Sequence, residues 1–155
     1  MKLPVVFTCV IGCLLFNTEL SAHCCWTKDN PGFYDLRVEI KNLGTENCNL
    51  EKQDLHKGTL YGSNTPLFLP STGEVFYLTL SGTEIDVTLT YNCGTNKNIS
   101  LVMKQYAKKN HKHTSIDAHA INAVNVFEKH TAKPVELGCC SSHDSFGLVT
   151  WDLSN

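Results

Sequence analysis

One stretch of alternating residues constrains the fold more than any other part of the chain. From Ile85 to Asn92, every second residue is apolar and the residues between are polar. A period of two is typical of a β-strand with one buried and one solvent-facing side. β-rich runs flank it, at Glu74–Gly82 and at Asn98–Tyr106, and short turn-forming segments separate the three. The stretch from Gly73 to Tyr106 therefore predicts a β-meander to which the other segments are added.

Further strands are expected on both sides of this meander. Clear alternation predicts strands at Phe33–Asn42 and Gly147–Leu153, and Cys48–Leu55 is interpreted as a short polar strand. Prolines at its margins make Gly58–Pro70 an edge strand or a loop. Ser115–Phe127 fits either a helix or a strand, and its Asn and β-branched residues favour the strand, whereas Pro134 favours a loop over Lys129–Leu137. The chain thus predicts an all-β fold, an antiparallel β-sandwich of about seven or eight strands.

The N-terminal residues have the features of an export signal. Lys2 is followed by the apolar run Val5–Phe16 and by small residues that end at Ala22. We therefore expect a secretory signal peptide over residues 1–22, a single domain over residues 23–155, and a secreted, extracellular or periplasmic location. Lipoprotein-type processing at Cys13 is the alternative.

The cysteines agree with export. Without Cys9 and Cys13, an even number remains, which is typical of a disulfide framework in an exported chain. Adjacent cysteines rarely pair with each other, so we expect one member of the first adjacent pair to bond to one member of the second. The predicted disulfide-forming residues are Cys24, Cys25, Cys48, Cys93, Cys139 and Cys140, and the sequence does not fix their connectivity.

A basic stretch follows the meander. The formal net charge of the chain is −2, which argues against bulk nucleic-acid binding. Between Asp86 and Asp117, however, several lysines and two histidines occur without any acidic residue. They predict either a positive ridge for anionic lipid, glycan or an acidic protein surface, or an ordinary solvated loop. The candidate binding residues are Lys104, Lys108, Lys109, His111, Lys112 and His113, with Lys97 nearby.

Histidines offer a different function. Cleavage after Ala22 would make His23 the N-terminal residue, whose α-amino and imidazole nitrogens together resemble the copper-binding histidine brace of the lytic polysaccharide monooxygenases and their relatives. The resemblance implies a copper cofactor and a redox enzyme or copper carrier. A weaker metal site at His111 and His113 is also possible on chemical grounds.

Enzymatic motifs are otherwise absent from the sequence. There is no Gly-x-Ser-x-Gly elbow, and His143, Asp144 and Ser145 are contiguous, whereas the members of a catalytic triad come from separate segments. No catalytic residue is assigned and the leading hypothesis needs no cofactor. The triplet Asn98-Ile99-Ser100 is an N-glycosylation sequon, relevant only in a eukaryotic secretory pathway. Aromatic residues such as Trp26, Phe68 and Trp151 could contact a glycan or a membrane, although core packing is their commoner use.

The order of the β-rich segments carries one family resemblance. Val38–Asn42, Gly58–Gly62, Gly73–Tyr77 and Ile85–Cys93 follow one another in a layout that resembles the aegerolysin-like and actinoporin-like β-sandwiches. The resemblance implies a small exported protein that engages membrane lipids, and it assigns no individual residue. The leading hypothesis is thus a small secreted, non-enzymatic binding module for a lipid, glycan or host-protein surface, with an effector or toxin-like role in virulence if the producer is a bacterium.

Overall fold

The computed structural model describes residues 34–107, 114–135 and 146–154, and the described chain is all-β. No helix that could cross a membrane occurs in these ranges. The strands are β1 (Tyr34–Asn42), β2 (Cys48–Leu60), β3 (Phe68–Leu69), β4 (Val75–Asn92), β5 (Asn98–Ala107), β6 (Thr114–Ile121), β7 (Phe127–Val135) and β8 (Phe146–Ser154).

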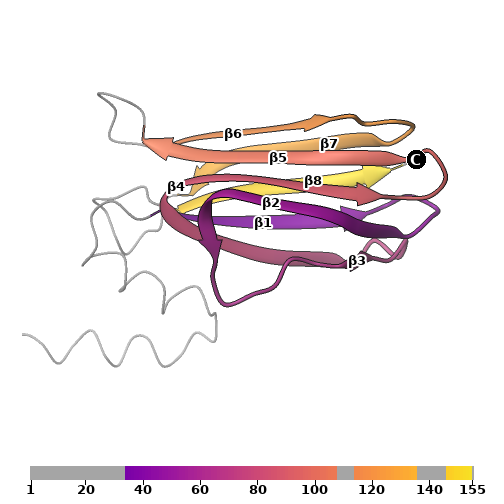
Figure 1. The fold of residues 1–155 in the computed structure, drawn as a ribbon, viewed down its shortest axis with the longest axis horizontal. Coiled ribbons are helices and arrows are strands. Elements are labelled where there is room, and N and C mark those ends of the chain that lie inside the picture. Colours follow the sequence, from indigo (N-terminus) through magenta and orange to yellow (C-terminus); the bar gives the residue numbers. More distant parts are fainter. Residues whose placement is uncertain (1–33, 108–113, 136–145, 155) are drawn as a thin grey trace, which may run out of the picture. The chain divides into compact units, whose positions relative to one another are not determined.

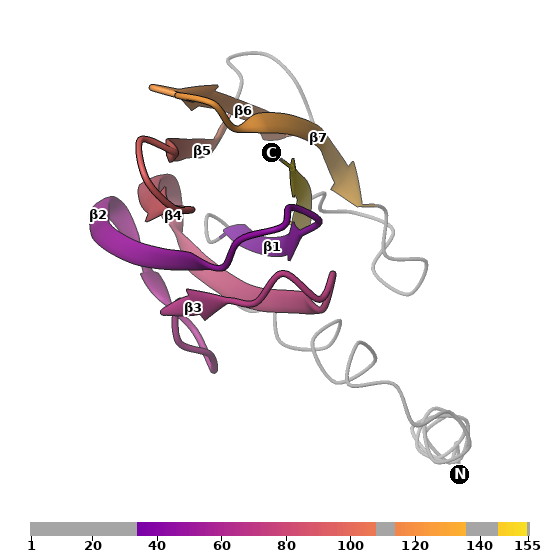
Figure 2. The same cartoon turned by 90° about the vertical axis from the view of Figure 1, so that its right-hand side faces the viewer.

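Strand β4 organises the sheet. Its first half pairs with β1, from Val75 opposite Lys41 to Gly82 opposite Tyr34. Its second half pairs with β5, and β2 borders β4 along both halves. The hydrogen-bonded order is β3-β2-β4-β1-β8-β7, with β5 and β6 branching from β4. Figures 1 and 2 show that β4 folds back on itself and thereby contributes to two facing layers, a sandwich-like arrangement.

The predicted meander is wrong in one respect. Its first two runs form a single strand, which folds back near Gly82 while its ladder with β2 continues from Lys57–Asp86 to Thr59–Ser81. Two glycines allow this bend. A Cβ atom on Gly82 would lie 2.9 Å from the Cα atom of Gly58, and Gly58 has a φ of +86°, a left-handed conformation that L side chains disfavour. The two strands therefore turn this corner together because neither carries a side chain there.

The expectation of an antiparallel sandwich holds for the pairs of described strands with one exception. β1 and β8 are parallel, from Asp35 opposite Phe146 to Asn42 opposite Leu153, and the other pairs are antiparallel. The physical reason lies in the connection. Parallel neighbours need a long crossover, and here all the other strands lie between β1 and β8 in the sequence. Alternation indicates which side of a strand is buried, but it carries no information about strand direction.

Two other segments differ in outcome. The strand interpretation of Ser115–Phe127 is confirmed for β6, which ends at Ile121. The loop predicted at Lys129–Leu137 is wrong, because β7 extends to Val135. Among the described strands, β7 pairs with β8 alone. Proline is tolerated on such an edge strand because no second neighbour needs its missing N–H group. Pro134 was therefore misinterpreted as a breaker.

The alternating residues form the core as predicted. Ile85, Val87, Leu89 and Tyr91 are completely buried, together with residues of β1, β5 and β8 such as Leu36, Val38, Ile40, Leu101, Met103, Val149 and Trp151. At Gly147 an added Cβ atom would lie 2.5 Å from the Cδ1 atom of Ile116. The two layers therefore approach closely at this position on β8.

Candidate functional site

The structure describes only part of the basic stretch. Lys104 lies on β5, where its Nζ atom is 2.9 Å from an oxygen of Asp86 on β4, and it is paired in register with Asp117 on β6. The hydrogen bond and charge of Asp86 raise the pKa of Lys104 above its usual value. Lys97 similarly contacts Glu46 at 3.2 Å. Lys104 thus lies beside acidic groups of the two neighbouring strands. The sequence did not show this proximity, because these residues are far from Lys104 along the chain.

The other candidates in this stretch lie outside the described residues, namely Lys108, Lys109, His111, Lys112 and His113, and so does His23 of the copper hypothesis. Within the described ranges, no group of three His, Cys, Asp or Glu side chains could hold a metal ion. One described histidine has a packing partner instead. The Nδ1 atom of His130 is 2.7 Å from Glu128, and its ring is 4.7 Å from that of Trp151.

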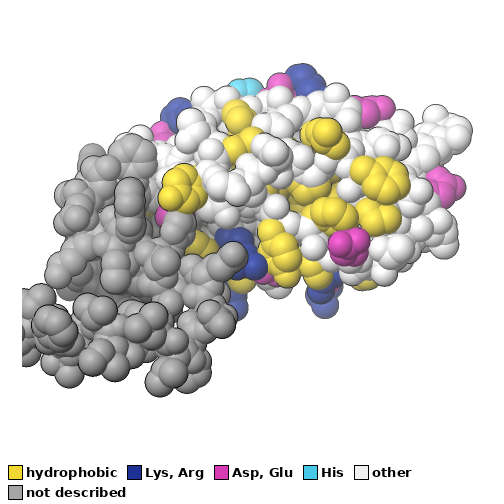
Figure 3. Space-filling model, turned by 90° about the horizontal axis from the view of Figure 1, so that it is seen from below, with side chains coloured by type: hydrophobic (Ala, Val, Ile, Leu, Met, Phe, Trp, Pro, Cys, Tyr) yellow, Lys and Arg dark blue, Asp and Glu magenta, His cyan; other side chains and the backbone are white. Residues whose placement is uncertain are grey.

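A surface of which the sequence analysis named only Phe68 contains exposed apolar residues. The connection between β2 and β3 runs beside the first half of β4, because Tyr61 N donates to Thr79 O and Thr79 N donates to Ser63 Oγ, both at 2.9 Å. Figure 3 shows hydrophobic side chains gathered on the face seen from below, where β3 and the start of β4 lie in Figure 1. We call the set Tyr61 (49% exposed), Leu67 (73%), Phe68 (46%) and Tyr77 (47%) the β3–β4 apolar surface.

A cation borders this surface. The guanidinium of Arg37 on β1 lies 4.5 Å from the centre of the Tyr77 ring, and its Nε atom is 3.4 Å from a carboxylate oxygen of Glu39. Tyrosine combines an apolar ring with a polar hydroxyl group and suits a boundary between apolar and aqueous phases. A guanidinium is well shaped for phosphate oxygens. The arrangement therefore combines apolar, interfacial and cationic groups.

Strand β3 is held in place by hydrogen bonds and by contact with the core. Leu50 N donates to Leu67 O at 2.9 Å, and the buried hydroxyl group of Tyr91 donates to Pro66 O at 2.9 Å. The side-chain amide of Asn42 donates to Leu69 O at 3.0 Å and to Glu46 O at 2.8 Å. These bonds fix the backbone on both sides of Leu67 and Phe68, so the two side chains are exposed on a well-anchored segment.

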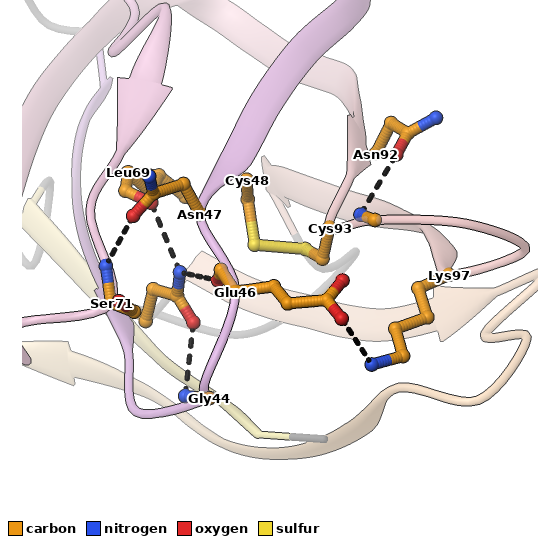
Figure 4. The surroundings of a disulfide bond; sticks show 11 residues. Gly44, Glu46, Asn47, Cys48, Leu69, Ser71, Asn92, Cys93 and Lys97 are labelled. Carbon is orange, nitrogen blue, oxygen red and sulfur yellow. Dashed lines mark hydrogen bonds and ion pairs between the residues drawn. A yellow bond between two sulfur atoms is a disulfide. The ribbon is translucent and has the colours of Figure 1, made fainter.

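A disulfide closes the same end of the molecule. Cys48, at the start of β2, is bonded to Cys93, which follows β4, with their Cα atoms 3.9 Å apart. Figure 4 shows this bond beside the Glu46–Lys97 contact. Both cysteines were predicted to form disulfides, and they pair with each other. Cys24, Cys25, Cys139 and Cys140, including the predicted bond between the two adjacent pairs, lie outside the described residues.

The aromatic residues considered in the sequence analysis differ in their exposure to solvent. Phe68 is exposed, Trp151 is completely buried, and Trp26 lies outside the described residues. Tyr61, Leu67 and Tyr77 were missed as surface residues. For Tyr77 the sequence did contain a signal. Leu78 and Leu80 alternate as buried residues of a strand, and Tyr77 occupies the opposite, solvent-facing side of the same pattern. Leu67 gave no such signal, because it lies before a strand of only two residues.

Comparisons with known proteins give a fold without a family. No family model matches the chain, and no curated protein matches it in sequence. Among solved structures, the chain is similar to the crystal structure of the lipid binding protein Nakanori, with a TM-score of 0.55 and 8% identity over 94% of this chain and 84% of that one. The described part of the chain is therefore all-β, contains a disulfide and shares the fold of a lipid-binding protein. This agrees with the predicted resemblance to lipid-engaging β-sandwiches, although neither of those families is shown.

Proposed function

We propose that this protein is an exported lipid-binding module that contacts membrane surfaces through the β3–β4 apolar surface. The observation that carries the proposal is the exposure of Leu67 and Phe68 on an anchored segment, together with the exposure of Tyr61 and Tyr77. The similarity in fold to a lipid-binding protein, over 94% of the chain, supports it. Exposed apolar clusters on small proteins commonly mark interaction surfaces.

Lipid is the partner that fits these residues best. Complete burial of a Leu or Phe side chain stabilises by about 1.5–3 kcal/mol, so Leu67 and Phe68 together supply a weak, reversible association. The hydroxyl groups of Tyr61 and Tyr77 can remain at the level of the headgroups, where tyrosine is commonly enriched. Arg37 lies against the Tyr77 ring, close to where lipid phosphates would be.

Export is part of the proposal. A disulfide such as Cys48–Cys93 is typical of proteins in oxidising compartments, which supports secretion directed by residues 1–22. An effector or toxin-like role in virulence would follow if the producer is a bacterium. Copper binding at His23 remains a separate hypothesis, which N-terminal sequencing of the mature chain and a copper titration would test.

Vesicle co-sedimentation of the purified protein tests the lipid proposal. With phosphatidylcholine vesicles, Leu67→Asp/Phe68→Asp should weaken binding roughly 100-fold, since two apolar contacts are lost and each 1.4 kcal/mol is tenfold. Phe127→Asp is the matched control, because Phe127 is 73% exposed but lies on β7. It should bind like the wild type.

Three results would contradict this assignment. Wild-type protein that fails to bind vesicles of phosphatidylcholine, with or without phosphatidylserine, removes the lipid function. Equal losses in the Phe127→Asp control show unspecific hydrophobic adsorption. Salt-sensitive binding to phosphatidylserine vesicles that is lost in Lys108→Glu/Lys109→Glu, but kept in the Leu67/Phe68 variant, moves the contact to the basic stretch. Circular dichroism confirms that each variant is folded.

A further inference from the structure

The sequon at Asn98 is not used by the lipid-binding hypothesis. It is the one Asn-x-Ser/Thr triplet of the sequence, and its three residues begin strand β5. The preceding turn is closed by Cys93 N, which donates to Lys97 O at 2.7 Å, and by Lys97 N, which donates to Gly94 O at 3.1 Å. Asn98 therefore lies where a surface turn enters the sheet, a place at which a large substituent can be accommodated.

The side chain of Asn98 is presented for modification. Its neighbour Ile99 is completely buried, and because side chains alternate along a strand, Asn98 faces outward. Of the two amide atoms, Oδ1 is enclosed without a hydrogen-bond partner, while the residue as a whole is partly exposed. The nitrogen, the atom to which an N-linked glycan is attached, thus belongs to a side chain at the surface of the sheet.

The side chain paired with Asn98 makes its hydrogen bonds elsewhere. Asn92 is paired with Asn98 across β4 and β5, but its own amide is engaged elsewhere. Its Nδ2 atom donates to a carboxylate oxygen of Glu51 at 3.0 Å, and its Oδ1 atom accepts from Gly94 N at 2.9 Å. Asn92 is therefore directed toward β2 and the turn, away from the Asn98 nitrogen.

From these observations we propose that Asn98 carries an N-linked glycan when the chain passes through a eukaryotic secretory pathway. The donor is a lipid-linked oligosaccharide diphosphate. A bond forms between Nδ2 and the anomeric carbon of the first sugar, the bond from that carbon to the phosphate oxygen breaks, and Nδ2 loses one proton as the lipid diphosphate leaves. In the folded protein the Ser100 hydroxyl group is 2.9 Å from that of Thr90, so the transfer takes place before β4 and β5 pair.

A glycan at this position is compatible with the β3–β4 apolar surface. Phe68 pairs with Asn49, Asn49 with Asn92, and Asn92 with Asn98, so they form one row across the sheet. Three strand spacings, about 14 Å, separate the two ends of this row. The glycan would thus keep the β5 side of this face away from a bilayer and leave the β3 edge available.

Expression in eukaryotic secretory cells tests the proposal. One sample carries the protein's own residues 1–22 and a parallel sample carries an unrelated secretory leader, so that secreted protein is obtained even if the native signal fails. Secreted wild type should lose mass on treatment with peptide N-glycosidase, and the treated peptide should contain Asp at position 98. Asn98→Gln and Ser100→Ala should lack this mass, and Ser100→Thr should keep it.

The matched control is Asn92→Gln, on the neighbouring strand of the same row, which should be glycosylated like the wild type. Secreted wild type without a glycan at Asn98, from either leader, overturns the proposal. A mass change that persists in Asn98→Gln also overturns it. Vesicle binding is not part of this readout, so failure of the lipid function leaves the result interpretable.

Discussion

The chain changes direction at two places that are held by opposite means. At the disulfide end, the Cys48–Cys93 bond and the buried Asn42 side chain tie the loops together. At the glycine corner, β2 and β4 bend together because Gly58 and Gly82 approach closely. The disulfide end is held by a covalent bond and by hydrogen bonds. The glycine corner depends instead on the absence of side chains at Gly58 and Gly82.

This difference determines how each place fails. A substitution at the disulfide end removes bonds, and the surrounding strands can stay where they are. A substitution at the glycine corner adds atoms where backbone already lies, so strands must separate. Both places bear on where β3 lies, since β3 pairs with β2 and β2 pairs with β4. Variants of the two can therefore be compared in the same assays of stability and vesicle binding.

The largest effect is expected from removal of the disulfide. Cys48→Ala/Cys93→Ala releases a loop with a sequence separation of 45 residues, and loop-closure entropy for that length gives a loss of ~4 kcal/mol in the free energy of unfolding. Urea denaturation measures it. The double variant is used because a single thiol could exchange with the other cysteines. A loss below about 1 kcal/mol would show that hydrogen bonds alone hold this end.

A smaller loss is expected at the glycine corner. In Gly82→Ala, the new Cβ atom would lie 2.9 Å from Gly58 Cα and 3.0 Å from Glu84 O, both backbone atoms that cannot rotate away. We expect a loss of about 2 kcal/mol, typical of overpacking. Differential scanning calorimetry measures the change.

Gly62→Ala is the control for the left-handed conformation, which Gly58 has and Gly82 does not. Gly62 has a φ of +65° but nothing within 4 Å of an added Cβ atom, so this variant reports the conformational cost alone, about 1 kcal/mol. If Gly82→Ala were as stable as the wild type, the corner would be adaptable and the contrast with the disulfide end would disappear.

The sequence predicts the strands and the buried side of each better than their arrangement. Alternation at Ile85–Asn92 correctly indicated which residues form the core. The same pattern did not show that the run before Gly82 is continuous with it, because the bend depends on Gly58, which is far away in the sequence. The parallel pairing of β1 with β8 was equally hidden. Period-two patterns do not encode partners.

The candidate sites show the same limit. The charge of Lys104 was visible in the sequence, but its neighbour Asp86 is brought close only by the pairing of β4 and β5. Leu67 and Phe68 were interpreted as edge or loop residues, and their exposure follows from the short length of β3, which leaves them at the margin of the sheet. Surface patches arise from tertiary contacts, which local patterns do not contain.

The smallest expected change in stability concerns Tyr91. It distinguishes the disulfide end from the glycine corner, because only the stability at the disulfide end should depend on the ionisation of Tyr91. Burial raises the pKa of Tyr91 above its usual value, and its hydroxyl group donates to Pro66 O near the disulfide end. A raised folded-state pKa means that the stability contribution is complete below the unfolded pKa, about 10, and is lost as the pH rises above it. The glycine corner itself, Gly58 and Gly82, has no ionisable side chain.

Tyr91→Phe should therefore show opposite effects at neutral and alkaline pH. At pH 7 it loses one buried hydrogen bond, a cost of about 1 kcal/mol. Above pH ~10 its stability should fall less steeply than that of the wild type, because no phenolate has to form in the core. Urea midpoints between pH 7 and 11 measure both, with the exposed Tyr77→Phe as control. Since Lys104 is retained in all three proteins, any alkaline loss that it causes cancels, and parallel pH profiles for Tyr91→Phe and the wild type would show that the alkaline sensitivity does not arise at Tyr91.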